Sequence, residues 1–88
     1  MLKIWKSSTG LIAGWVSDAA ENQACRDEIE QAWNSEFPEE AGYCFPIKIP
    51  KLPPMQSLSA GKIEALVSRG YEVLNDTQMQ EIVDNYSD

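Results

Sequence analysis

Two short apolar runs near the start of the chain predict a β-hairpin. Residues 2–6 and 11–16 are rich in Ile, Trp and Val, and residues 7–10 between them have the composition of a turn. Gly14 interrupts the second run, which indicates either a bulge or a close approach of another backbone. We therefore expect two paired strands here.

A helical period follows the hairpin. Residues 19–34 are predicted to form a helix, because apolar positions recur at steps of four, three and one. Ser17 or Asp18 is the expected cap, and Asp18 and Glu21 have the spacing of a capping box. The predicted inward face consists of Cys25, Ile29, Ala32 and Trp33.

Prolines shape the middle of the chain. Residues 43–49 have the composition of a strand, but Pro46 cannot donate a hydrogen bond to a sheet. We therefore expect an edge strand, or a strand that begins at Ile47. The connector that follows should be extended, because it contains Pro50, Pro53 and Pro54.

The pattern then predicts a helix over residues 60–69, with Ser59 as its N-cap and Gly70 just beyond its end. The apolar stripe of this helix is Ile63, Leu66 and Val67. A short strand over 71–74 and a third helix should follow, the helix being capped by Asn75 or Asp76. Its inward face is Met79, Ile82, Val83 and Tyr86, the cleanest helical period in the chain.

The element order is therefore ββαβαβα, and the predicted fold class is α+β. We expect a small single domain over residues 1–88, in which the N-terminal hairpin and three helices pack on a small mixed sheet. The run of strand, helix and strand in the second half could form a right-handed parallel unit. No stretch approaches the roughly 18 apolar residues of a membrane span, and no secretion leader is apparent, so we expect a cytoplasmic protein.

Residue types restrict the chemistry. The chain has no histidine, so Ser-His and Cys-His nucleophile pairs are excluded, and the carboxylate pairs at 27–28 and 39–40 lie in polar sequence. Cys25 and Cys44 are 19 positions apart, and a zinc site built from two thiols would be unusual. Since no secretion signal is apparent, reduced thiols are favoured over a disulfide. No glycine-rich phosphate loop occurs. We therefore expect no enzyme activity, no metal and no cofactor.

Charge is unevenly distributed along the chain. The net charge is −7, and residues 18–40, the acidic segment, hold eight acids and one base, whereas the remainder has six of each. A surplus of this sign makes direct binding to nucleic acid improbable. Three interpretations of the acidic segment stay open: a solvated surface that maintains solubility, a mimic of nucleic-acid phosphates, and a patch that meets another kind of basic protein.

Candidate partner-binding residues come from the acidic segment and from the hairpin. In a helix, carboxylates three or four positions apart could form a row at spacings broadly similar to those of phosphates. The two hairpin tryptophans are either core residues or, if one is exposed, interface anchors. The candidate residues are Asp27, Glu28, Glu30, Glu36, Glu39, Glu40, Trp5 and Trp15.

Size, acidity and the lack of catalytic groups give the chain a compositional likeness to the small inhibitors of bacteriophages and mobile elements, including anti-CRISPR and anti-restriction proteins. This resemblance assigns no role to any residue. The leading hypothesis is a non-enzymatic inhibitor or adaptor that engages a basic, nucleic-acid-binding protein. The alternative is a self-associating structural or regulatory module, a homodimer formed through the edge strand or the hairpin tryptophans.

Overall fold

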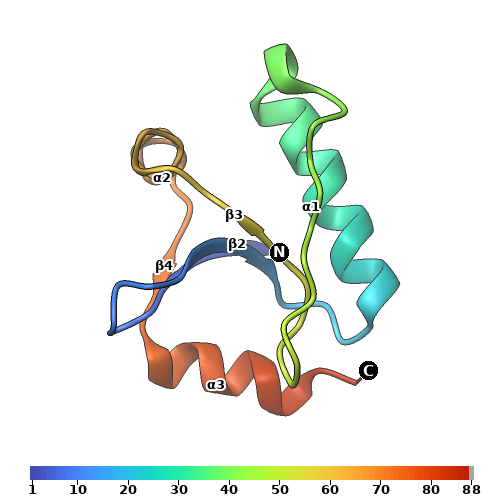
Figure 1. The fold of residues 1–88 in the computed structure, drawn as a ribbon, viewed down its shortest axis with the longest axis vertical. Coiled ribbons are helices and arrows are strands. Elements are labelled where there is room, and N and C mark those ends of the chain that lie inside the picture. Colours follow the sequence, from blue (N-terminus) through green and yellow to red (C-terminus); the bar gives the residue numbers. More distant parts are fainter. Residues whose placement is uncertain (88) are drawn as a thin grey trace.

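The computed structural model describes residues 1–87, which form a four-stranded sheet with helices on both faces (Figure 1). The predicted α+β class and element order are confirmed. A short 3-10 helix, η1, is an addition to the predicted order. In chain order the elements are β1 (Leu2–Lys6), β2 (Ala13–Ser17), α1 (Asn22–Glu36), η1 (Pro38–Glu40), β3 (Met55–Ser57), α2 (Ala60–Ser68), β4 (Val73–Leu74) and α3 (Asp76–Asn85).

The N-terminal hairpin forms the centre of the sheet, whose strand order is β3-β2-β1-β4. β1 and β2 are antiparallel with Ile4 opposite Trp15, β3 is antiparallel to β2, and β4 is parallel to β1. β3 and β4 therefore run in the same direction but lie at opposite edges. The strand–helix–strand unit that the sequence indicated is therefore present with parallel strands. Its two strands, β3 and β4, are not neighbours, because both hairpin strands lie between them.

The side chains of the hairpin alternate between two cores. One core lies between the sheet and the helices α1 and α2, and the other lies between the sheet and α3 (Figure 1). Ile4 and Trp15 belong to the first core, whereas their neighbours Trp5 and Val16 belong to the second, as the period of two in a strand requires. Ile29 and Trp33 of α1 are buried as predicted, together with Cys25.

Gly14 marks a close approach rather than a bulge. A Cβ atom at this position would lie 3.1 Å from the Met55 sulfur and 3.2 Å from the Gln56 carbonyl oxygen. The glycine therefore allows β3 to pack tightly beside β2.

Two of the three predicted helix starts are confirmed. The Ser59 side chain accepts a hydrogen bond from the Lys62 amide in α2, and Asn75 and Gln78 form a capping box in α3. The start predicted for α1 is wrong: this helix begins at Asn22, and its cap residue Glu21 makes no side-chain capping bond. Asp18 is turned to the N-terminal ammonium instead.

The strand predicted over residues 43–49 is also wrong. Only Ile47 pairs there, in an isolated bridge to Met55, and the third strand is Met55–Ser57. Pro46 leaves this stretch without one of its backbone donors. In the second half of the chain, Val67 was expected to face inward, but 46% of it is exposed.

Candidate protein-binding surface

The chain returns along α1 after η1. The Gly42 amide donates to the Asn34 side chain at 3.1 Å, and the Arg26 guanidinium donates to the Pro46 carbonyl at 3.0 Å. These two bonds hold residues 42–46 alongside the helix, as Figure 1 shows in green and yellow. The outer face of α1 and the segment beside it therefore form one continuous surface.

Asp27 and Glu30 are the exposed acids of that outer face. Asp27 accepts a hydrogen bond from Gln23 at 2.8 Å, and neither carboxylate has an ion pair within residues 1–87. Glu39 in η1 is likewise exposed and has no ion pair in the described chain. These three carboxylates leave their negative charge facing solvent.

Glu36 and Glu40 point toward α2 instead. Glu36 pairs with Arg69 at 3.1 Å, and Glu40 pairs with Lys62 at 2.6 Å. Both cations also lie over the Phe37 ring, with centroid distances of 5.8 Å for Arg69 and 5.2 Å for Lys62. These carboxylates join the end of α1 and the following η1 to α2 and its cap residue, and the molecule's own cations offset their charge.

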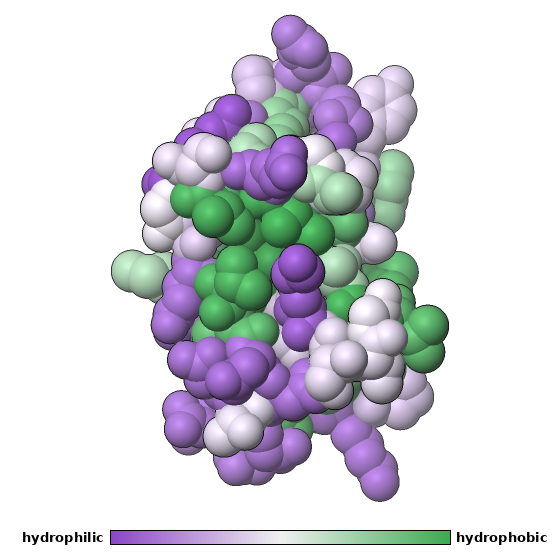
Figure 2. All heavy atoms as spheres, turned by 90° about the vertical axis from the view of Figure 1, so that its left-hand side faces the viewer, coloured by the Kyte–Doolittle hydropathy of each residue, from purple (hydrophilic) through white to green (hydrophobic). Residues whose placement is uncertain are grey.

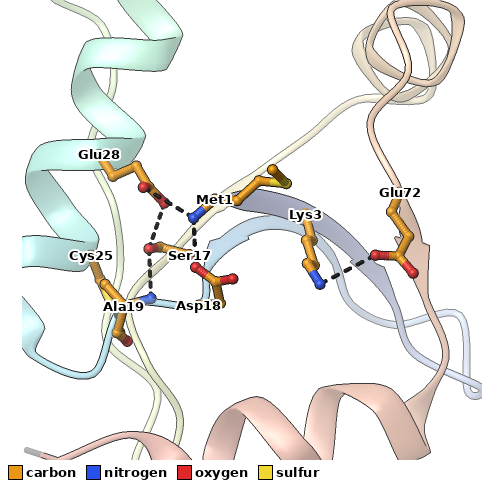
Figure 3. Close-up of polar contacts among 8 residues, drawn as sticks. All are labelled: Met1, Lys3, Ser17, Asp18, Ala19, Cys25, Glu28 and Glu72. Atoms are coloured by element: carbon orange, nitrogen blue, oxygen red, sulfur yellow. Dashed lines mark hydrogen bonds and ion pairs between the residues drawn. The ribbon is translucent and has the colours of Figure 1, made fainter.

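Glu28 faces the opposite side of α1, where it meets the N-terminus (Figure 3). The Met1 ammonium donates to Asp18 at 2.5 Å and to Glu28 at 3.2 Å, and Ser17 donates to the second Glu28 oxygen at 2.7 Å. The hydrogen bond to Asp18, together with that to Glu28, raises the pKa of the ammonium above its usual 8.0, against a lowering by burial. Glu28 thus ties α1 to the first and second strands.

The candidate carboxylates therefore do not form the single row that was predicted. Asp27 and Glu30 share the outer face, Glu36 and Glu40 are paired with α2, and Glu28 is paired with the N-terminus. Helical periodicity places residues on faces, but the pairing cations come from distant positions in the sequence.

Both hairpin tryptophans are core residues, which confirms the first of the two predicted places for them, and the alternative of an exposed interface anchor is wrong. Trp15 is fully buried, and its indole nitrogen has no hydrogen-bond partner in the described structure. Trp5 is 9% exposed and donates to the Asp76 carboxylate at 3.0 Å. Alternation in the hairpin buries both, because each face of the sheet is covered by helices.

Four large exposed apolar residues were missed on the segment after η1 and on the hairpin. They are Leu11, Tyr43, Phe45 and Ile47. The last three alternate with Cys44 and Pro46, which are buried. This period of two is present in the sequence, where it predicts a strand rather than a row of surface side chains.

Potential nucleophiles are shielded. Ser17 hydrogen bonds to Glu28, but its side chain is fully buried and also accepts from the Ala19 amide at 3.0 Å. Burial raises the pKa of the Cys44 thiol to about 11, and burial also raises the pKa of Cys25, whose sulfur contacts the Ala19 carbonyl (Figure 3). Both thiols therefore stay protonated near neutral pH. Residues 1–87 contain no cluster of three or more Cys, Asp or Glu side chains able to hold a metal ion.

None of the helices in the described part of the chain has the length and apolar character needed to cross a membrane. A scan against protein-family models finds no match for this chain, and searches of curated proteins and of solved structures find none either.

Proposed function

We propose that this protein is a non-enzymatic inhibitor or adaptor that binds a basic, nucleic-acid-binding protein. The contact surface is the outer face of α1 with the segment that follows it. The observation that supports this most directly is the pair Asp27 and Glu30, two exposed carboxylates that have no ion pair within residues 1–87, whereas Glu28, Glu36 and Glu40 each have one.

Unpaired carboxylates on a rigid helix suit a cationic groove. Residues three positions apart on a helix have Cβ atoms about 5–6 Å apart, so Asp27 and Glu30 present two charges at a fixed spacing. The net charge of −7 would draw the molecule to a positive surface, and salt would weaken that attraction. An inhibitor of the anti-CRISPR or anti-restriction kind fits this chemistry. The proposed setting is the cytoplasm, which agrees with two free cysteines.

Charge reversal tests the proposal with a matched control. Asp27→Lys with Glu30→Lys is compared with Glu81→Lys and Asp84→Lys on α3. The control pair is also exposed, has the same spacing, and includes an acid that accepts from a glutamine four positions earlier, Gln80 at 2.9 Å. The total change in charge is identical in the two variants.

The measurement starts with affinity purification from host lysate at low and high salt. The recovered protein is then purified and titrated against each variant. The α1 variant should bind at least about tenfold more weakly, and the α3 variant should retain most of the affinity. Equal affinities for the wild type and the α1 variant would contradict the proposal, as would a partner that is neither basic nor able to bind nucleic acid.

A homodimer is the second candidate function. β4 is an edge strand, and its residue Val73 and Val67 of α2 are 41% and 46% exposed. With Ile63 they line a shallow apolar hollow, and Figure 2 shows apolar residues gathered on this side of the molecule. Sedimentation analysis over a wide range of concentrations tests this: a mass that stays monomeric throughout would remove it.

A further inference from the structure

The segment after η1 presents a row of large apolar side chains. Tyr43, Phe45 and Ile47, called here the apolar row, are 68%, 70% and 53% exposed. Cys44 and Pro46 between them are buried, so every second side chain faces solvent, as along one face of an extended strand. Exposed apolar residues that occur singly are ordinary, whereas a contiguous group is typical of interaction sites.

The row is held in place from both sides. The Phe45 amide donates to the Gln56 side chain at 2.9 Å, and Ile47 exchanges backbone hydrogen bonds with Met55 at 2.9 and 3.0 Å. On the other side, Arg26 of α1 donates to the Pro46 carbonyl. A backbone fixed in this way loses little conformational entropy on binding, so its side chains suit a preformed interface.

The apolar surface continues to the hairpin. Ile47 lines a small hollow together with Ile49, Ile12 and Leu11, and Leu11 is 86% exposed. The row therefore extends over the β3 edge of the sheet.

Carboxylates border the other side of the row. Glu30 lies close enough to Cys44 for its charge to contribute to the raised pKa of that thiol, and Asp27 is on the same outer face of α1. Apolar side chains beside unpaired acids match a partner that combines apolar and basic groups. A second copy of this chain would bring like charges together on this face, which disfavours self-association here.

We propose that Tyr43, Phe45 and Ile47 are the apolar anchors of the contact with a basic protein, and that this partner presents apolar residues flanked by lysine or arginine. The inference rests on the proposed function and deepens it. The apolar row supplies the desolvated centre of the contact, and Asp27 and Glu30 supply its charged rim.

The first experiment uses a defined probe. It is a synthetic peptide in which leucine and tryptophan alternate with arginine, and its control peptide has glutamate in place of every arginine. Amide chemical shifts of the full chain are followed during titration. The arginine peptide should shift resonances of residues 27–30 and 43–47, and the glutamate peptide should leave them unchanged. No binding by the arginine peptide, or shifts gathered around Val67 and Val73, would overturn the proposal.

Variants then separate the anchors from the charged rim. Tyr43→Ala with Phe45→Ala should weaken binding of the arginine peptide at least about tenfold. Val67→Ala with Val73→Ala, two other exposed apolar residues, should leave it unchanged. Unchanged amide shifts elsewhere in each variant verify that the fold is intact.

The outcomes distinguish this inference from the proposed function. If the Tyr43 and Phe45 variant keeps its affinity while the Asp27 and Glu30 variant loses it, the inference about the apolar anchors fails, whereas the proposed charged contact is supported. If neither variant loses affinity, both proposals fail. A concentration-dependent dimer that the Tyr43 and Phe45 variant abolishes would show that the row binds a second copy, which also overturns the inference.

Discussion

Gly14 sets the distance between β2 and β3. Replacing it with alanine places a methyl group 3.1 Å from the Met55 sulfur and 3.2 Å from a backbone oxygen. We expect Gly14→Ala to lower the free energy of unfolding by about 1–3 kcal/mol, because the backbone of β3 must shift. Urea denaturation measures this. Gly61→Ala in α2 is the control: its added Cβ meets nothing within 4 Å, and it should stabilise the protein by roughly 0.5 kcal/mol.

Asp76 connects α3 to the hairpin and makes stability depend on acid pH. Hydrogen bonds from Ser8, and after them the bond from the Trp5 indole, lower the pKa of Asp76 below its usual 3.8. A carboxyl whose pKa is lower in the folded state stabilises the fold above pH 3.8, and this contribution is lost as the pH falls through the folded pKa. The free energy of unfolding of Asp76→Asn should therefore fall less steeply in acid than that of the wild type.

The comparison is made by urea denaturation from neutral pH to below pH 3.8, with Trp5 and the other indoles as fluorescent reporters. Asp84→Asn on the same helix is the control, because the Asp84 carboxylate accepts a hydrogen bond from Gln80 of its own helix rather than from the hairpin. If the free energy of unfolding of Asp76→Asn falls as steeply in acid as that of the wild type, this carboxylate does not govern the pH dependence of stability.

Among the elements, α3 has the most complete N-terminal cap. The Asn75 side chain accepts from the Gln78 amide at 2.8 Å, and Gln78 accepts from the Asn75 amide at 2.9 Å. Asn75→Ala should cost about 1 kcal/mol of unfolding free energy. Glu21→Ala, at the cap of α1 where no side-chain bond exists, should change stability by less than about 0.5 kcal/mol. Equal losses in thermal denaturation would contradict this difference.

Elements that depend on local sequence were predictable. The turn between β1 and β2, the Ser59 and Asn75 caps and the glycine after α2 all act within a few residues. The failures involve distant partners. Ser17 was expected near the start of α1, but it bonds to Glu28 11 positions away. The third strand forms at Met55 because Gly14, far earlier in the chain, allows a close approach.

The candidate surface was only partly predictable for the same reason. Asp27 and Glu30 were identified from helical periodicity, which is local. The sequence could not show that Glu36, unlike Asp27 and Glu30, forms an ion pair, because its partner Arg69 lies 33 positions away. The sequence left open whether a hairpin tryptophan is a core residue or an interface anchor; Trp15 is covered by helices on its side of the sheet, and Tyr43 and Phe45 are exposed instead.

At the scale of the whole molecule, the acidic segment divides into two electrostatic classes. Asp27→Lys with Glu30→Lys removes negative charges that have no cation partner in the described part of the chain, so this variant should be at least as stable as the wild type. Glu36→Lys with Glu40→Lys brings cations against Arg69 and Lys62, and should lose at least about 1 kcal/mol. The difference in unfolding free energy between these two variants should become smaller in high salt, and urea denaturation measures it. Equal stabilities at low salt would show that the ion pairs contribute nothing.

The short edges of the sheet limit how the molecule can polymerise. β3 has three residues and β4 has two, so an added strand from a neighbour would gain few main-chain hydrogen bonds. Fibre growth by strand stacking needs long, regular edges that repeat from one molecule to the next. We therefore expect that exposed rings such as Tyr43 and Phe45 do not lead to amyloid-like stacking, so that other molecules are recognised through side chains rather than through a shared sheet.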